Sequence, residues 1–177
     1  MRAHSSSSSK GIQDAQGRWQ DIPSGHPHVD YAGSSAALEG TIAELNLPAH
    51  ISTLFETSTR FCFLGMWRPL KTVKRDPLAV CDATSVADED YQIRERVFSR
   101  TGFKSENYVM SHAGEEQRHE WWYMSEMKPT EMVVFKGLDS KRDQSGWRCP
   151  HTAFRLESRE REPPRESVEA RVLCLWE

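Results

Sequence analysis

The chain lacks long apolar runs, is poor in cysteine and carries no large excess of charge of one sign. Without about 20 consecutive apolar residues, no membrane-spanning helix is expected. The N-terminus, MRAHSSSSSK, has no apolar core of a secretory signal peptide. A formal net charge of −3 over 177 residues, with no basic stripe, does not favour nucleic-acid binding. We therefore expect a cytoplasmic protein with neither a membrane nor a nucleic acid as partner, and its oligomeric state stays open.

The four cysteines are too widely spaced for a structural zinc site, since no two of them form a CxxC pair. Each lies in an apolar or strand-like stretch, where cysteine behaves as a small buried hydrophobic residue. In a cytosolic chain such thiols stay reduced. We expect free, buried thiols at Cys62, Cys81, Cys149 and Cys174.

What the chain does have is enough apolar residues for one folded domain. Hydrophobic residues make up 37% and aromatic residues 10% of the sequence. The first residues differ in composition, because a five-serine run is followed by mostly polar positions. This composition predicts a flexible, Ser-rich segment over residues 1–24 and a single domain over residues 25–177.

Short apolar stretches dominate that domain. One helix is expected to begin at Ser34–Leu38, because serine can cap it and Leu38, Ile42 and Leu45 recur at helical spacing. Strand-like stretches, punctuated by Pro, Gly, Asp and Ser, follow at 60–67, 78–82, 107–110, 120–124, 132–136, 149–154 and 167–176. Many short strands and few helices favour a mainly β sandwich or jelly roll.

The triplet His28-Val29-Asp30 can grip a metal, because residues i and i+2 of an extended segment point to one face. A second, distant histidine would complete a two-histidine, one-carboxylate triad, which suits iron(II) and leaves positions open for a 2-oxo acid and dioxygen. Alone, the triplet is also compatible with a loop histidine beside a capping aspartate. His26-Pro27-His28 offers a further alternative, an HxH pair.

Of the seven histidines, only His151 is followed by a matching motif, Arg165-Glu166-Ser167. In oxygenases of this kind, an arginine and a serine at alternating strand positions bind the far carboxylate of 2-oxoglutarate. A guanidinium fork pairs with a carboxylate bidentately, and a hydroxyl adds one bond. A surface arginine after a Pro-Pro turn is the bland alternative. The order HxD, His, RxS is more specific than any of its parts.

With these motifs the chain resembles the AsaB-type hydroxylase/desaturase family of fungi and bacteria, which includes a gibberellin desaturase and a component of cephalosporin 7-methoxylation. The matching stretches are collinear and cover nearly everything from about residue 26 to the end. They are HVDY at 28–31, MWRPLK at 66–71, PLAVCD at 77–82 with SV at 85–86, WWY at 121–123, FK at 135–136 with DS at 139–140, PHTAF at 150–154 and PPRESVEAR at 163–171.

The resemblance implies a double-stranded β-helix, cupin-like, with a few flanking helices. It implies a non-haem oxygenase that uses iron(II), 2-oxoglutarate and dioxygen to hydroxylate or desaturate a small specialised metabolite. No catalytic group beyond the metal ligands is expected. The implied sites are the metal ligands His28, Asp30 and His151, the 2-oxoglutarate residues Arg165, Ser167 and, ranked second, Arg171, and the substrate-pocket residues Arg68, Trp122 and Tyr123.

Two departures from the family pattern keep other functions open. Family members carry a longer stretch before the HxD triplet, so we expect the barrel to lack a strand or two of its N-terminal part. Gly65-Met66 stands where the family has Asn-Val. The alternatives are an N-terminally truncated, non-catalytic homologue and a metal-dependent cyclase or isomerase of the same fold that does not use 2-oxoglutarate.

Overall fold

The computed structural model describes residues 12–13, 19–20, 23–45, 47–97, 104–114, 118–143 and 146–177. The expected Ser-rich segment 1–24 lies outside the described residues except at 12–13, 19–20 and 23–24. The helices are α1 (Ser35–Leu45) and α2 (Ala49–Thr57), with 3-10 turns at Ala83–Ser85, Asp88–Asp90 and Glu157–Arg159. The strands are β1 (Ile12–Gln13), β2 (Trp19–Gln20), β3 (His28–Val29), β4 (Arg60–Pro69), β5 (Leu78–Cys81), β6 (Tyr91–Val97), β7 (Lys104–Met110), β8 (Trp121–Tyr123), β9 (Val133–Asp139), β10 (His151–Ala153) and β11 (Ser167–Trp176).

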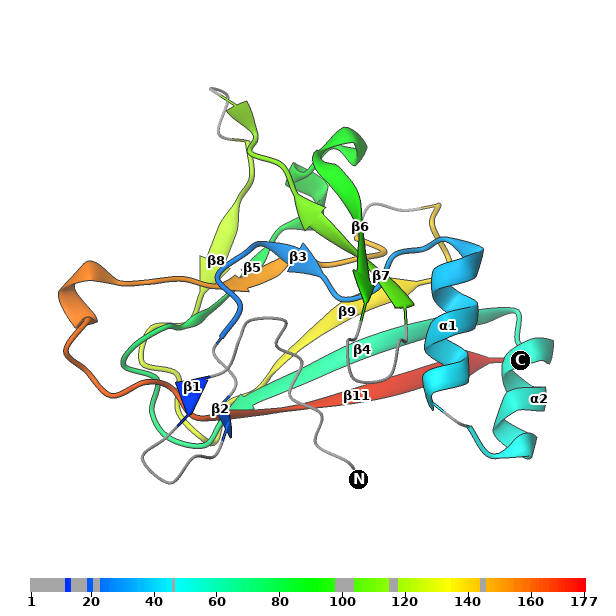
Figure 1. Ribbon diagram of the computed structural model, residues 1–177, viewed down its shortest axis with the longest axis horizontal. Helices are drawn as coiled ribbons and strands as arrows, with labels where there is room; N and C mark the ends of the chain where they lie inside the picture. The colour runs from blue at the N-terminus through cyan, green and yellow to red at the C-terminus, as the bar shows by residue number, and fades with distance from the viewer. Residues whose placement is uncertain are drawn as a thin grey trace.

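Two antiparallel sheets form the body of the molecule. One has six strands in the order β6-β7-β3-β10-β5-β8, and the other has three in the order β11-β4-β9. Figure 1 shows β4, β9 and β11 running side by side as one layer, while α1 and α2 lie at the end where the chain terminates. This arrangement confirms the predicted mainly β class with few helices.

The inner face of the three-stranded sheet is set by alternation along β4. Phe63, Gly65 and Trp67 share one face, and the register places Arg171 of β11 and Phe135 of β9 on either side of Gly65. A Cβ at Gly65 would lie 2.5 Å from the Phe135 ring, so only glycine lets this ring cross the strand. The Phe135 ring reaches the other sheet, with its centroid 4.4 Å from that of His151.

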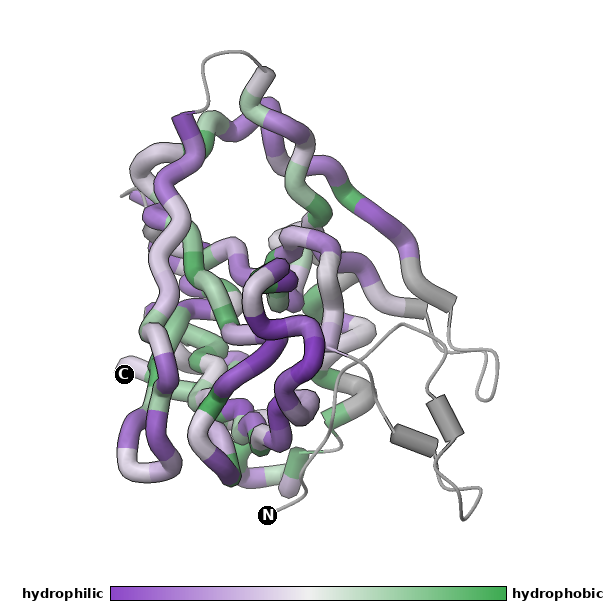
Figure 2. The backbone as a smooth tube through the Cα atoms, turned by 90° about the vertical axis from the view of Figure 1, so that its left-hand side faces the viewer, coloured by the Kyte–Doolittle hydropathy of each residue, from purple (hydrophilic) through white to green (hydrophobic). Residues whose placement is uncertain are grey.

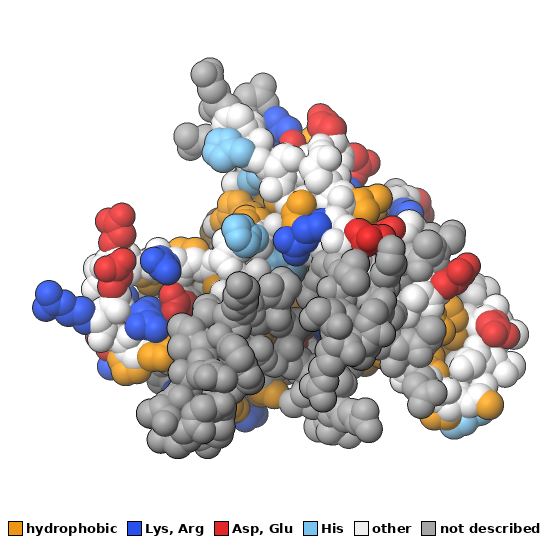
Figure 3. Space-filling view, viewed as in Figure 1, with side chains coloured by type: hydrophobic (Ala, Val, Ile, Leu, Met, Phe, Trp, Pro, Cys, Tyr) orange, Lys and Arg blue, Asp and Glu red, His pale blue; other side chains and the backbone are white. Residues whose placement is uncertain are grey.

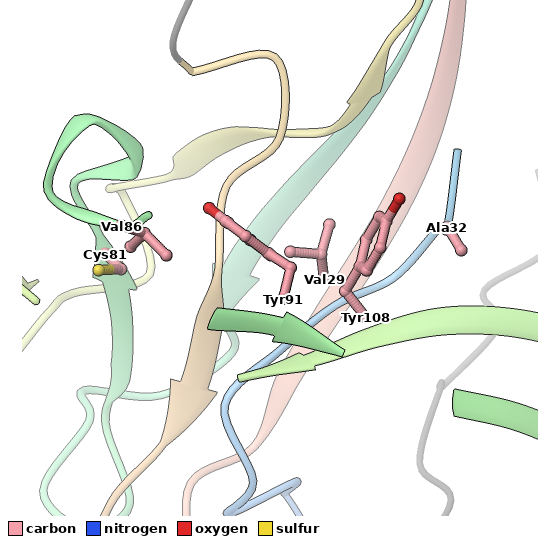
Figure 4. Packing of buried hydrophobic residues seen from close by; sticks show 6 residues of the cluster. All are labelled: Val29, Ala32, Cys81, Val86, Tyr91 and Tyr108. Atoms are coloured by element: carbon pink, nitrogen blue, oxygen red, sulfur yellow. The ribbon is translucent and has the colours of Figure 1, made fainter. Parts of the chain in front are cut away.

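The two faces of the six-stranded sheet have different roles. On one face Val29, Tyr91 and Tyr108 form the centre of a buried apolar cluster. Figure 4 shows the Val29 side chain lying between the two tyrosine rings. The opposite face carries His28 and His151 side by side, because β3 and β10 pair at these residues. The apolar cluster thus packs against one face of β3 and fixes which residues of this strand face the other sheet.

Four elements differ from the sequence-based expectation. The short strands β1 and β2 pair within the segment that was expected to be flexible. Helix α2 was not predicted, because the sequence indicated one helix followed by strand-like stretches from residue 60 onwards. Strand β6 was not predicted, because charged residues interrupt its apolar pattern and Ile93 is 57% exposed. Its backbone pairs with β7 along the whole strand. Among the described side chains of β6 only Tyr91 is buried, so strand formation here rests mainly on backbone pairing with a neighbour.

Surface and interior separate as expected for such a fold. Figure 2 shows that many of the loops leaving the sheets are hydrophilic, and Figure 3 shows acidic and basic side chains interspersed outside the grey atoms. None of the described helices is long and apolar enough to cross a membrane.

All four cysteines are free thiols, as predicted, with Cys62 and Cys81 buried and Cys149 and Cys174 partly buried.

Candidate metal centre

Three side chains converge between the two sheets. His28 of β3 and His151 of β10 are direct cross-strand neighbours, with ring centroids 4.5 Å apart. Asp30 follows β3 by one residue. Each of the three offers a ligand atom, and these atoms all lie within 4.8 Å of one another. The structure therefore brings together the HxD pair and the distal histidine that the sequence singled out.

The histidine rings are oriented by backbone carbonyls. His28 Nδ1 lies 2.7 Å from the carbonyl oxygen of His26, and His151 Nδ1 lies 3.1 Å from that of Cys149. A proton on Nδ1 donated to these carbonyls leaves Nε2 with its lone pair for a metal. Both Nε2 atoms face the Asp30 carboxylate, at 3.8 and 3.9 Å. His26 thus contributes its carbonyl, while its own side chain is exposed.

Burial keeps the first of these ligands neutral. It lowers the pKa of His28 from 6.5 to about 4, with repulsion from His151 adding to the effect and Asp30 opposing it. A metal ion needs the neutral imidazole, so no proton has to be displaced at neutral pH. The Asp30 side chain is only 4% exposed and supplies the negative charge between the two rings.

Arg171 and Glu169 approach the same carboxylate from β11. Arg171 Nη2 lies 3.1 Å from Asp30 Oδ2, and Arg171 Nε lies 3.3 Å from Glu169 Oε1. Burial alone would lower the pKa of Arg171, but the charges of Asp30 and Glu169 raise it above its ordinary value. Burial and the nearby Asp30 raise the pKa of the Glu169 carboxyl, and Arg171 opposes them.

Arg165 occupies a separate buried position before β11. Its Nη1 donates to the carbonyl oxygen of Asp76 at 2.9 Å, and its guanidinium lies 5.0 Å from the Trp67 ring centroid. Its Nε is buried and has no hydrogen-bond partner among the described residues. Burial lowers the pKa of Arg165 to about 10, with Asp76 and Glu169 opposing. A buried cation with an unsatisfied donor fits an anionic ligand.

The remaining predicted residues divide by sheet face. Ser167 pairs with Pro69 at the start of β11, on the same face of that strand as Glu169 and Arg171. Arg68 pairs with Val168 and is exposed on the opposite face, so the structure places it away from the triad.

Trp122 of β8 and the neighbouring Tyr123 also point to different faces. Trp122 pairs with Val80, which pairs in turn with His151, so it shares the face of His28 and His151 and is 64% exposed. Tyr123 alternates to the other face and packs edge-on against Phe154 at 4.9 Å. Trp122 therefore stays a candidate for the substrate pocket, and Tyr123 does not.

Sequence reasoning missed Glu169, although a signal for it was present. Glu169 lies two residues before Arg171 and two after Ser167, so strand alternation turns it to the same face.

A pocket of about 870 Å³ borders β10 through Thr152 and Ala153, but no member of the triad lines it. It is therefore distinct from the metal centre.

Comparison with known proteins finds similarity to oxidoreductases. A protein-family model described as "Oxidoreductase/YMDC permease-like domain" matches residues 2–175. The hydroxylase/desaturase asaB of Aspergillus flavus is 41% identical over 130 residues, which cover 67% of this chain and 57% of that protein. The hydroxylase/desaturase efuI of Hormonema carpetanum is 34% identical over 159 residues, covering 85% and 51% respectively. The chain thus spans about half the length of these relatives.

Solved structures give the same answer for the fold. The iron and alpha-ketoglutarate-dependent endoperoxidase NvfI superposes with a TM-score of 0.70 and 26% identity, over 88% of this chain and 55% of that one. A second structure of NvfI, 24% identical, gives a TM-score of 0.72 over 94% of this chain and 58% of that one. The jelly-roll prediction is confirmed by this likeness.

Proposed function

The chain belongs to the family described as an oxidoreductase/YMDC permease-like domain, and we propose that it is an iron(II)- and 2-oxoglutarate-dependent oxidoreductase that hydroxylates or desaturates a small specialised metabolite. The observation that carries the proposal is the convergence of His28, Asp30 and His151 between the two sheets. The similarity of the chain to hydroxylase/desaturases of Aspergillus flavus and Hormonema carpetanum supports the same class of chemistry.

The donor set fits iron(II). Two imidazole nitrogens and one carboxylate on one side of an ion leave the other side open, as oxygenases require. His28 and His151 are held in the same tautomer by carbonyl oxygens, which suits two neutral nitrogen ligands. Asp30 supplies the single anionic ligand. Cysteine, the usual ligand of structural zinc, is absent from this described cluster.

Arg165 is the proposed anchor for the far carboxylate of 2-oxoglutarate, and Ser167 is its proposed helper. The unsatisfied buried Nε of Arg165 is the supporting observation, because burying a guanidinium N–H without a partner is costly. Bound together, iron(II), 2-oxoglutarate and dioxygen supply an oxidant able to remove hydrogen from an unactivated C–H bond. Arg171 stays a weaker candidate for the cosubstrate, because it is paired with Asp30 and Glu169.

The chain's own contribution is to exclude water and to position groups. The Phe135 ring covers one side of His151, and Trp67 covers Arg165. Val80 and Trp122 extend the face of the metal ligands towards solvent, so they form the proposed wall for an apolar substrate. Arg68 and Tyr123 point away from this wall and are not retained as substrate contacts.

The test uses the purified chain with iron(II), ascorbate and 2-oxoglutarate in air. We expect succinate release that is abolished in His151→Ala. Arg165→Ala should raise the KM for 2-oxoglutarate by roughly 30-fold or more, since it breaks a buried charge pair, while metal binding is kept. Arg161→Ala removes an exposed arginine of the nearby turn and serves as the matched control.

Other outcomes point to the alternatives. Succinate release that survives in His151→Ala would remove the metal assignment. Metal binding by the wild-type chain without any succinate release would favour a metal-dependent cyclase or isomerase. Absence of metal binding would favour a non-catalytic homologue.

A further inference from the structure

Glu169, on the inner face of β11, lies along the chain between Arg165, which precedes the strand, and Arg171, which belongs to it. The Glu169 side chain is 18% exposed. The register sets Glu169 opposite Trp67, whose ring lies beneath the Arg165 guanidinium. One carboxylate is therefore close to both cations that could receive an anionic cosubstrate.

The contacts form a chain that ends on a metal ligand. Glu169 Oε1 lies 3.3 Å from Arg171 Nε, and Arg171 Nη2 lies 3.1 Å from Asp30 Oδ2. The guanidinium is planar, so holding its Nε side fixes the direction in which Nη2 points. Glu169 thus orients the group that in turn orients Asp30.

We propose that Glu169 is a positioning residue with opposite effects on the two ligands of this site: it strengthens metal binding and weakens 2-oxoglutarate binding. The 2-oxoglutarate half rests on the proposed function, whereas the metal half rests only on the His28–Asp30–His151 cluster.

Two physical effects act in the same direction on the metal. Glu169 holds Arg171 on Asp30, and loss of such an outer contact lowers metal affinity by about 10- to 100-fold in characterised sites. Glu169 also adds negative charge beside a cation in a poorly hydrated space. Removing its charge should therefore weaken metal binding through both effects.

The same charge opposes an anion. 2-Oxoglutarate is a dicarboxylate, and its far carboxylate must approach Arg165 in the field of Glu169. Glu169 also occupies Arg171 with an internal carboxylate. Removing the charge should therefore tighten 2-oxoglutarate binding, which a purely structural role of Glu169 would not do.

The experiment compares Glu169→Gln and Glu169→Asp with the wild-type chain. Cobalt(II) affinity is measured by absorbance titration, and 2-oxoglutarate affinity by calorimetry at saturating cobalt(II). We expect Glu169→Gln to bind cobalt(II) about tenfold more weakly and 2-oxoglutarate several-fold more tightly. Glu169→Asp keeps the charge and should restore most of both values.

Glu166→Gln is the matched control, because it removes one negative charge three residues away, at an exposed carboxylate that pairs with Lys71. It should leave both affinities unchanged. The proposal is overturned if Glu169→Gln binds cobalt(II) and 2-oxoglutarate more weakly to the same extent, or if neither affinity changes. A wild-type chain that binds cobalt(II) but not 2-oxoglutarate refutes the proposed function and the anion half, and the cobalt(II) comparison still decides the metal half.

Discussion

Two nearly buried aspartates, Asp139 and Asp30, occupy contrasting environments in this molecule. The Asp139 side chain is 1% exposed at the end of β9, and the Asp30 side chain is 4% exposed between the sheets. Asp139 pairs with Arg60 of the neighbouring strand β4, and Asp30 pairs with Arg171 of β11 in the opposite sheet. The contrast lies in what else surrounds each carboxylate.

Asp139 is enclosed by donors. Arg60 bonds both of its oxygens, from Nε at 2.9 Å and from Nη2 at 2.5 Å. The ammonium of Lys136 lies at 3.0 Å, and the backbone N–H of Lys141 donates at 3.0 Å. Burial would raise the pKa of Asp139, but these bonds hold it well below its ordinary range. This carboxylate stabilises the fold and has no need of a further cation.

Asp30 is surrounded differently. Two histidine nitrogens face it at 3.8 and 3.9 Å, beyond direct hydrogen bonding, and a second carboxylate, Glu169, shares its arginine. Burial and the charge of Asp30 both raise the pKa of Glu169, because a second negative charge is unfavourable here without a further cation. The difference teaches that a buried ion pair with its donors complete is structural, whereas an acidic, histidine-lined pair is suited to a cation.

The largest expected effect comes from the matched pair Asp30→Asn and Asp139→Asn. Asp30→Asn removes the anionic ligand and should lower cobalt(II) affinity by at least about 100-fold, with little loss of stability. Asp139→Asn leaves Arg60 and Lys136 without their anion and should lower the free energy of unfolding by about 3 kcal/mol. Absorbance titration and urea denaturation measure the two quantities.

Each variant controls for the other. Asp139→Asn, studied where it remains folded, should bind cobalt(II) like the wild-type chain. If Asp30→Asn were the more destabilised of the two, Asp30 would be a structural residue and the contrast would fail.

In the metal-free protein, the two environments should lose their contributions to stability at different pH values. The pKa of His28 is about 4 in the folded chain, against 6.5 for an exposed histidine, so the unfolded chain binds more protons between these values. Stability should therefore be complete above pH 6.5 and fall as the pH drops to about 4, by roughly 3 kcal/mol. The depressed pKa of Asp139 gives a contribution that is lost only below its unfolded value near 3.8.

Urea denaturation at several pH values checks this order. His28→Gln cannot take up the proton and should flatten the slope between pH 6.5 and 4. A slope of wild-type size in that variant would assign the effect to other groups.

Local signals were enough to predict much of the fold and the three residues that converge between the sheets. Helix α1 and most strands follow from apolar periodicity, and His28, Asp30 and His151 were found because HxD and RxS are local motifs. Strand β6 was missed, since its register with β7 is a long-range property.

Pairing between distant strands set the parts of the site that were not predicted. Strand alternation combined with pairing places Arg68 on the face away from the triad and Trp122 on the face of His151, and neither could be assigned from spacing alone. Strand alternation with Ser167 and Arg171 could have indicated the face of Glu169, but its contact with Arg171 is known only from the structure. Motifs indicate the chemistry of such a site, while the sheet register decides which neighbours modify it.

The smallest expected effect distinguishes His26 from His28. The sequence HPH offers both imidazoles to a metal, yet the structure uses the carbonyl of His26 to orient His28 and leaves the His26 side chain exposed. His26→Ala keeps that carbonyl, so cobalt(II) affinity should stay within about twofold of wild type, whereas His28→Ala should lose binding altogether. A tenfold loss in His26→Ala, measured by the same titration, would mean that the HxH pair holds the metal. The backbone oxygen matters here because it selects the tautomer of a neighbouring ring, a role that any residue with the same backbone conformation can fill.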